Sequence, residues 1–288
     1  MVAILASKLE AQKEGTKVSR VVINQNGKKL KRIDTIYIGY DDREHLATNV
    51  LIDSIERLAS RPINVVTLNL KSLRLSGLYR RTPHVNSTVW GKDPVNNMVD
   101  AFDERPFSTD FSFSRFLIPF LNQHEGLALF MDCDMFFRDD PCILFDEFYD
   151  QNKAVSCVKS KHEDKVDLGL KMYGCPQTKY SRKNWSSFVL WNCGHESHKN
   201  LTVDDVNTKP GRWLHNFLWL SDEEIGDLPA RWNWLDGYSD ENVDPANVHF
   251  TTGGPWFDRW KAKRPIDQKY ADEWKVLSAK VLTKIQSI

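Results

Sequence analysis

One apolar run that contains two carboxylates constrains the fold of this chain more than any other feature. The run Leu127–Phe137 reads Leu-Ala-Leu-Phe-Met-Asp-Cys-Asp-Met-Phe-Phe, so its only charged residues are Asp132 and Asp134. A run of this kind is typical of a strand buried on both faces, as in the parallel sheet of an α/β domain. Because a buried carboxylate without a partner costs several kcal/mol, we expect the pair where the strand leaves the sheet.

The spacing of the two carboxylates indicates a cation bound together with phosphates. In an extended chain, residues two apart project to the same side, so Asp132 and Asp134 can face one ligand. Paired oxygen ligands suit Mg²⁺ or Mn²⁺, which usually bind through one or two carboxylates and substrate phosphates. The carboxyl ends of such strands are also where α/β sheets bind nucleotides. The sequence therefore predicts a divalent cation held against a nucleotide diphosphate.

Two other interpretations of the pair remain open. The first is an Asp-rich turn after a strand, in which both acids are solvated. The second is a phosphatase, because haloacid-dehalogenase-type enzymes also have Asp-x-Asp after an apolar strand, followed two residues later by Thr or Val. Phe136 stands at that position here, and the strand lies near the middle of the chain rather than at its start.

Composition narrows the partners and the compartment. The 288 residues include 39 basic and 39 acidic side chains, so no overall field attracts nucleic acid or an anionic membrane. No run reaches the ~18 apolar residues of a membrane span, and no signal-peptide core precedes the first strand. The five cysteines are an odd number without a Cys-x-x-Cys pair, and Cys133 and Cys157 lie in apolar runs. We expect a reduced, cytoplasmic protein.

Hydrophobic periodicity predicts a β-α-β opening. An apolar strand over 33–40 is followed by a helix over 44–60 and a second strand over 63–70, which indicates an α/β sheet with right-handed crossovers. We expect residues 1–32 to be an extension or a strand pair outside the core. Further predictions are long loops over 71–110, a helix over 111–123, a strand over 154–158, an apolar segment over 185–191, turns over 228–254 and a C-terminal helix over 266–288, which is amphipathic from 274.

The order of these segments resembles the GT-A glycosyltransferases. The likeness is greatest to the retaining family-8 group, which includes glycogenin and bacterial lipopolysaccharide galactosyl- and glucosyltransferases, and it spans residues 33–260. More narrowly, the chain resembles bacterial and viral members of that superfamily with unassigned acceptors. The resemblance implies one GT-A (Rossmann-like) α/β domain over 33–265, with a mostly parallel central sheet flanked by helices.

The first strand and its turn match the place where that group holds the base and ribose of the donor. The segment is Ile-Tyr-Ile-Gly-Tyr-Asp-Asp over 36–42, and it contains Gly39, Tyr40 and Asp41. An acidic residue after the first strand can accept hydrogen bonds from a ribose, as in dinucleotide-binding folds. The alternative is that Asp41 simply favours the turn.

Two further segments match the family before and at the metal motif. Ser-Phe-Ser-Arg-Phe over 112–116 stands where the group has Thr-Tyr-x-Arg-Leu, which implies that Arg115 contacts the donor. A structural salt bridge is the other interpretation of Arg115. Asp132, Cys133 and Asp134 correspond to the family's metal motif, which also borders the donor.

The segment His-Phe-Thr-Thr-Gly-Gly-Pro-Trp over 249–256 resembles the family's His-x-x-Gly-x-x-Lys-Pro-Trp. The resemblance implies that His249 is the third protein ligand of the metal, and neutral imidazole suits Mn²⁺ better than Mg²⁺. Gly253 and Gly254 would let the backbone approach a pyrophosphate. Gly254 also occupies the position of the family's lysine, which neutralises the departing diphosphate. The candidates to replace that lysine are Arg259, Lys261 and Lys263.

Two looser matches concern the sugar. Residues 184–192 stand where the family lines the donor-sugar pocket, which suggests a role for Ser187. Asp222 and Glu223 are candidate catalytic residues, because the family has Asp-Gln-Asp beside the reacting carbon; an exposed acidic helix end is the alternative. Nine of the ten tryptophans lie after residue 180. They are candidates to stack on an acceptor sugar or to fill the core.

Together these features predict metal-dependent transfer of a sugar from a nucleotide-diphospho-sugar, UDP-linked, to an acceptor hydroxyl with retention. Mn²⁺ or Mg²⁺ is expected on Asp132, Asp134 and His249. The expected partners are the donor and a glycan or another hydroxyl acceptor; the neutral charge argues against nucleic acid without excluding it. The rival predictions are a metal-dependent phosphohydrolase and a catalytically inactive binding module, the latter favoured by the missing lysine before Pro255.

Overall fold

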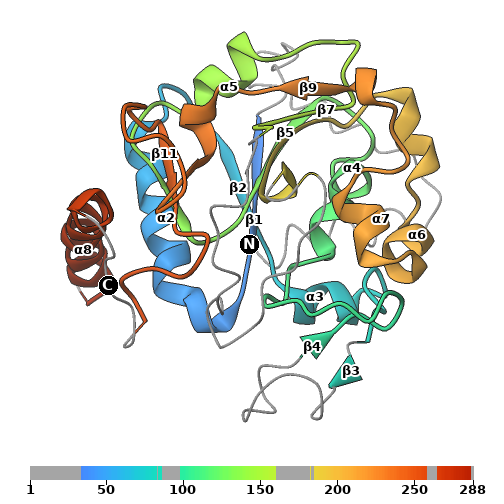
Figure 1. The fold of residues 1–288 in the computed structure, drawn as a ribbon, viewed down its shortest axis with the longest axis horizontal. Helices are drawn as coiled ribbons and strands as arrows, with labels where there is room; N and C mark the ends of the chain where they lie inside the picture. Colours follow the sequence, from blue (N-terminus) through green and yellow to red (C-terminus); the bar gives the residue numbers. More distant parts are fainter. Residues whose placement is uncertain are drawn as a thin grey trace, which may run out of the picture.

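A six-stranded mixed sheet organises the chain. The computed structural model describes residues 34–82, 84–85, 98–159, 182, 185–257 and 265–286, so the predicted extension over 1–32 lies outside the described residues. The strand order is β2-β1-β5-β8-β7-β9, and only β8 runs antiparallel to the other five, which confirms the expected mostly parallel sheet (Figure 1). The strands are β1 Thr35–Gly39, β2 Asn64–Leu68, β5 Leu127–Met131, β7 Val155–Cys157, β8 Phe188–Asn192 and β9 Ile225–Asp227.

Helices cover both faces of this sheet. α2 (His45–Leu58) lies on one side, and α4, α6 and α7 lie on the other (Figure 1). α2 forms the crossover between β1 and β2, and it buries Leu51 and Ile55 in the main core. The remaining helices of the main domain are short: α3 Leu70–Leu75, α4 Ile118–Leu121, α5 Cys142–Glu147, α6 Val203–Thr208 and α7 Gly211–His215.

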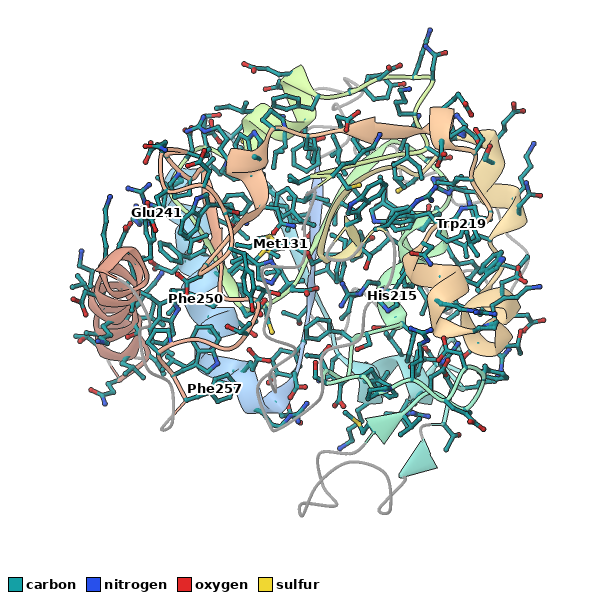
Figure 2. All side chains as sticks on the ribbon, in the orientation of Figure 1. Met131, His215, Trp219, Glu241, Phe250 and Phe257 are labelled. Atoms are coloured by element: carbon teal, nitrogen blue, oxygen red, sulfur yellow. The ribbon has the colours of Figure 1, made fainter. Side chains whose placement is uncertain are left out.

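A second, three-stranded sheet begins directly after the turn that contains the two aspartates. β6 (Met135–Phe137) continues after β5, and it pairs antiparallel with β11 (Asn247–His249), which pairs in parallel with β10 (Trp234–Leu235). The outer face of α2, the small sheet and α8 (Pro265–Gln286) enclose a second core. Phe250 belongs to this core, and Trp219 belongs to the main core near α6 and α7 (Figure 2).

Short elements complete the described part of the chain. A two-stranded ladder joins β3 (His84–Val85) and β4 (Met98–Val99). The 3₁₀ turns are η1 Asp42–Glu44, η3 Ser114–Leu117, η5 Trp185–Ser187, η6 Glu196–Asn200, η7 Asp222–Glu224 and η8 Ala230–Asn233. None of the described helices is both long enough and apolar enough to cross a membrane.

The structure corrects two sequence predictions of local structure. The helix expected over 111–123 is a 3₁₀ turn followed by the four-residue α4, because this segment is buried on all sides and has no single helical face to favour. The loops expected over 71–110 contain the ladder of β3 and β4, and α3 begins just before them. α8 spans Pro265–Gln286, in agreement with the C-terminal helix predicted over 266–288.

The tryptophans mainly fill the core. Trp191, Trp232 and Trp234 are at most 1% exposed, and Trp274 and Trp219 at most 9%. Trp191 stacks on Trp219 with ring centroids 6.4 Å apart. These five side chains therefore support the core interpretation rather than an acceptor-stacking surface.

Candidate metal centre

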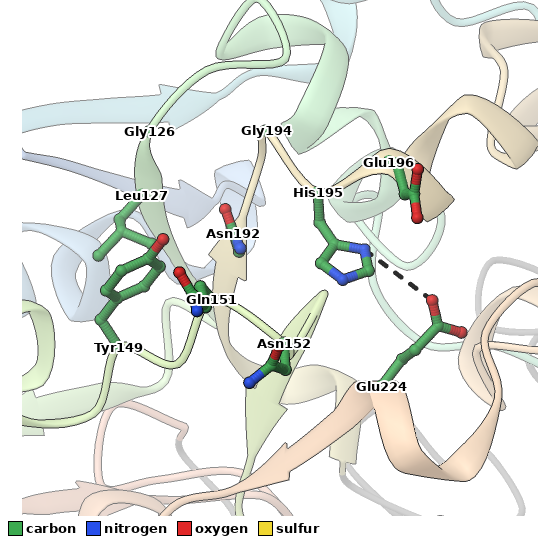
Figure 3. Close-up of a pocket in the computed structure, with 10 residues that line it drawn as sticks. All are labelled: Gly126, Leu127, Tyr149, Gln151, Asn152, Asn192, Gly194, His195, Glu196 and Glu224. Atoms are coloured by element: carbon green, nitrogen blue, oxygen red, sulfur yellow. Dashed lines mark ion pairs between the residues drawn. The ribbon is translucent and has the colours of Figure 1, made fainter.

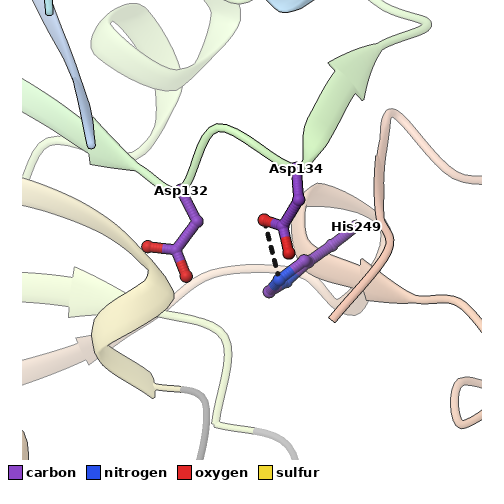
Figure 4. A group of neighbouring side chains, drawn as sticks. All are labelled: Asp132, Asp134 and His249. Carbon is purple, nitrogen blue, oxygen red and sulfur yellow. Dashed lines mark ion pairs between the residues drawn. The ribbon is translucent and has the colours of Figure 1, made fainter. Parts of the chain in front are cut away.

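Asp132, Asp134 and His249 meet where β5 leaves the main sheet. β5 ends at Met131 and β6 begins at Met135, so the aspartates occupy the turn between the strands, as predicted. β11 brings His249 opposite Met135, and the Phe250 amide donates to the Asp134 carbonyl at 2.9 Å. One oxygen of each carboxylate and one ring nitrogen of His249 lie within 4.8 Å of one another (Figure 4).

The hydrogen bonds of His249 fix which nitrogen faces Asp134. Asn233 Nδ2 donates to Ser187 Oγ at 3.1 Å, so Asn233 Oδ1 is left to accept from His249 Nδ1 at 2.8 Å. Nε2 then presents its lone pair to Asp134 Oδ1 at 3.3 Å. Both groups are buried and Asp134 Oδ1 has no hydrogen-bond donor, so a proton or a cation must lie between the two acceptors. The donor set of two carboxylates and one imidazole fits Mn²⁺.

Asp132 is held by Arg115. The Arg115 guanidinium forms an ion pair with Asp132 at 2.9 Å, and it donates to the Ser186 carbonyl at 2.8 Å. Arg115 also lies over the Phe130 ring, 4.8 Å from its centroid. Arg115 thus forms a salt bridge, and this salt bridge keeps the Asp132 carboxylate oriented toward the centre.

Ser187 and Asn233 support the centre through hydrogen bonds. The Asp132 amide donates to the Ser187 carbonyl at 3.0 Å, and the Ser187 hydroxyl accepts from Asn233. Both side chains are at most 5% exposed. Asn233 was not singled out from the sequence, although a polar residue between the buried Trp232 and Trp234 was a usable signal. Ser187 therefore lies next to the centre, where it accepts hydrogen bonds from Asp132 and Asn233.

The turn after β1 is tied down by its own side chains. A side chain at Gly39 would collide with the Phe111 ring, so this glycine is required by packing. The Tyr40 hydroxyl hydrogen-bonds with His45 at 3.0 Å. Burial opposes ionisation of Asp41, but hydrogen bonds from Arg43 and its charge hold the pKa of Asp41 below its usual value. The Asp41 carboxylate is thus already neutralised by a neighbour.

Cys133 lies on the opposite side of the turn from the two aspartates. Its side chain is fully buried in the main core, and burial raises the pKa of the thiol well above its ordinary value. A neutral, buried thiol is a packing group. Cys133 therefore enters the centre through its backbone position between Asp132 and Asp134.

The segment after β11 is shaped by its two glycines. Gly253 has φ of +101°, a conformation that favours glycine. A side chain at Gly254 would meet the Trp256 ring, so the position of the family's lysine is closed to any larger residue here. The candidate replacements Arg259, Lys261 and Lys263 lie outside the described residues.

Asp222 and Glu223 lie at the amino ends of the parallel strands, opposite the end at which Asp132 and Asp134 lie. They belong to η7, which leads into β9, and β9 runs parallel to β7 and in the direction of β5. They therefore precede their strand, whereas Asp132 follows its own. Asp222 forms an ion pair with Arg182, and Glu223 is exposed. The structure does not bring these carboxylates to the metal centre.

A pocket of about 700 Å³ also lies at that far edge (Figure 3). It is bordered by Tyr149, by the amides Gln151, Asn152 and Asn192, and by His195, whose Nδ1 lies 3.9 Å from a Glu224 oxygen. Gly126 and Leu127 at the start of β5 line it, so the length of β5 separates this pocket from the metal centre.

The fold and the centre together define a mixed α/β protein with an Asp-Asp-His group at the carboxyl edge of its sheet. Protein CDI of Arabidopsis thaliana is 41% identical to the chain over 254 residues, which cover 86% of this chain and 87% of that protein. The chain belongs to the same family as Protein CDI. No protein-family model matches it.

Solved structures with a similar arrangement are glycosyltransferases. The galactosyltransferase LgtC in complex with donor and acceptor sugar analogues is 14% identical, with 85% of this chain and 95% of that chain covered and a TM-score of 0.49. Mouse xyloside xylosyltransferase 1 is 12% identical, with 77% and 100% covered and a TM-score of 0.44. WbbM, a bifunctional glycosyltransferase, is 17% identical over 78% of this chain at a TM-score of 0.48, and the match spans about half of WbbM, 47%. At these identities and TM-scores the likeness does not extend to the activity of this chain.

Proposed function

We propose that this chain is a glycosyltransferase that moves a sugar from a nucleotide-diphospho-sugar, UDP-linked, to an acceptor hydroxyl with retention. The main support is the pair of buried acceptors, His249 Nε2 and Asp134 Oδ1, which face each other at 3.3 Å at the carboxyl edge of the sheet. A divalent cation removes their repulsion, and this edge is where α/β sheets bind nucleotides.

In this proposal Asp132, Asp134 and His249 hold Mn²⁺, or Mg²⁺. The cation supplies charge that stabilises the departing nucleotide diphosphate. Arg115 keeps Asp132 oriented, and Asn233 keeps the His249 lone pair directed at the cation. The turn at Tyr40 and Asp41 borders the base and ribose, and the backbone at Gly253 and Gly254 borders the phosphates.

Asp222 and Glu223 are not part of this proposal. Both are exposed at the amino edge, and Asp222 already pairs with Arg182. Cys133, Cys142 and Cys157 are buried free thiols, which supports a reducing, cytoplasmic setting.

Calorimetric titration of UDP and of GDP, each with and without Mn²⁺, tests the proposal. We expect UDP to bind only with Mn²⁺, and Asp134→Asn to weaken that binding by at least about a hundredfold, because the variant lacks a ligand charge. Asp204→Asn is the matched control, since this side chain is 81% exposed and remote from the centre. Equal binding of UDP by Asp134→Asn and the unmodified protein would contradict the proposal.

A catalytically inactive binding module is the second candidate. The observation in its favour is Gly254, because the Trp256 ring excludes any lysine from the position before Pro255. Release of free sugar from UDP-sugars in the presence of Mn²⁺ separates the two. Mn²⁺-dependent UDP binding without hydrolysis or transfer would favour the module, and phosphate release from simple esters would favour a phosphohydrolase.

A further inference from the structure

Glu44 lies buried next to the metal centre and has no role in the argument so far. It ends η1, directly after β1, and β1 is the neighbour of β5 in the sheet. Its amide donates to the Asp41 carbonyl at 2.9 Å, and its carbonyl accepts from Thr48 Oγ1 at 3.1 Å. The backbone thereby fixes Glu44 at the start of α2, beside the turn that holds Asp132 and Asp134.

The carboxyl group of Glu44 has no partner among the described residues. The residue is 1% exposed, and neither Oε1 nor Oε2 accepts a hydrogen bond. Burial, followed by the charges of Asp134 and Asp41, raises the pKa of Glu44 well above its usual value. A group in this position is costly for the fold alone, because burial of an unpaired carboxylate is unfavourable.

The acidic side chains around the turn carry more charge than the neighbouring basic side chains neutralise, and a divalent cation matches the difference. Arg43 pairs with Asp41, and Arg115 pairs with Asp132, so each of these carboxylates is offset by one guanidinium. Asp134 and Glu44 remain without an arginine or lysine partner in the described part of the chain. His249 contributes a lone pair but no negative charge. Two unbalanced carboxylates therefore correspond to one cation of charge two.

We propose that Glu44 is a third acidic residue of the divalent cation centre, in addition to Asp132 and Asp134, and that its carboxylate supplies the second of the two negative charges that the cation neutralises. The proposal rests on the metal dependence of the proposed function. Glu44 is not a member of the group within 4.8 Å formed by Asp132, Asp134 and His249, so in this proposal its charge acts on the cation from the start of α2. The centre is then specific for divalent over monovalent cations.

Titration of Mn²⁺ alone into the protein, without nucleotide, tests this role. We expect Glu44→Gln to weaken Mn²⁺ binding by about thirtyfold or more, since it removes one charge near the cation in a buried site. Glu44→Met, an apolar residue of similar length, should give the same loss and provides a second variant if the amide does not fold. Thermal unfolding in EDTA reports folding of both variants, and the midpoint should equal or exceed that of the unmodified protein.

Asp42→Asn is the matched control, because it removes the same charge from an exposed neighbour in the same turn. It should leave the Mn²⁺ affinity within about twofold, since solvent screens its charge. If Asp134→Asn abolishes Mn²⁺ binding while Glu44→Gln and Glu44→Met bind it normally, the role of Glu44 is overturned and the metal centre stands. If the unmodified protein does not bind Mn²⁺, both proposals are overturned.

Discussion

Two buried groups of charged residues in this protein differ in how completely their charges are balanced. In the first, Arg81 and Asp100 form an ion pair at 2.6 Å, and both side chains are 2% exposed. Arg81 also donates to the Val206 carbonyl, and Asp100 accepts from the Gly211 amide at 2.9 Å. The Phe113 ring covers the guanidinium, 4.1 Å from its carbon. Every charge in this first group has a partner from the chain itself.

The second group is the metal centre, where some buried acceptors have no hydrogen-bond donor among the described residues. Asp134 Oδ1 and the two oxygens of Glu44 are buried without hydrogen-bond partners, and His249 directs a lone pair toward Asp134. Burial is therefore common to both groups, and only the balance of charge distinguishes them. A balanced group stabilises the fold, whereas an unbalanced one marks a place where a ligand supplies the missing charge.

The largest expected effect is on the balanced group. Asp100→Ala leaves Arg81 buried without its counter-ion, so the free energy of unfolding should fall by about 3–5 kcal/mol. Chemical denaturation measures this loss, and Mn²⁺ affinity should not change in the fraction that folds. Asp204→Ala is the control, because its ion pair with Arg80 is exposed and should contribute less than about 1 kcal/mol. A similar loss in both variants would contradict the distinction.

The buried side chain of His198 extends the comparison to the pH dependence of stability. His198 is 1% exposed, its Nε2 donates to the Ala154 carbonyl at 3.1 Å, and burial lowers the pKa of His198 to about 4. The folded protein thus keeps His198 neutral where the unfolded chain, with a pKa of 6.5, takes up a proton. Its contribution to stability is complete above pH 6.5 and is lost as the pH falls toward 4, by about 3 kcal/mol.

Replacement of this histidine, His198→Gln, should remove this component of acid sensitivity. The glutamine amide can still donate to the Ala154 carbonyl but does not titrate. The difference in unfolding free energy between the variant and the unmodified protein should therefore change by about 3 kcal/mol between about pH 7 and pH 4. Denaturant melts at several pH values measure it. A difference that is constant with pH would show that His198 takes up its proton equally readily in the folded and the unfolded protein, so that burial does not lower its pKa.

Most of the sheet was predictable from sequence because its strands have a strong apolar signal. The strands β1, β2 and β5 lie within their predicted ranges, and the carboxylates interrupt the apolar run where β5 ends. The segment over 111–123 was not predictable, because it is buried on every side and hydrophobic periodicity cannot then distinguish a helix from irregular turns.

The residues of the site also divide into those that the sequence predicts and those that it does not. Asp132, Asp134 and His249 were predicted, since a metal ligand is recognised by residue type and by motif. Glu44 and Asn233 were not, because their importance depends on what surrounds them: one lacks any partner among the described residues, and the other accepts from His249. The positions of Asp222 and Glu223 depend on strand direction, which a short acidic segment does not encode.

A smaller effect is expected where the chain supports the unbalanced group. Asn233→Ala removes the acceptor that fixes the His249 tautomer, and loss of such a partner typically costs about 10–100-fold in metal affinity. Mn²⁺ titration measures it. Asn233→Asp keeps an acceptor for His249 Nδ1 and should bind Mn²⁺ about tenfold more tightly than Asn233→Ala. Equal affinities in the two variants would show that the tautomer of His249 does not depend on Asn233.

The smallest effect is expected at the pocket on the opposite edge of the sheet. Gln151 and Asn152 line this pocket but are exposed, so water satisfies their amides and no ligand is needed to balance them. Gln151→Ala and Asn152→Ala should therefore change neither the thermal midpoint nor the Mn²⁺ affinity, the latter by less than about twofold. A larger change in Mn²⁺ affinity would mean that the two edges are coupled through β5, and that polar groups open to solvent also contribute to cation binding. Unchanged affinity would confine the effect to groups that are both buried and unbalanced.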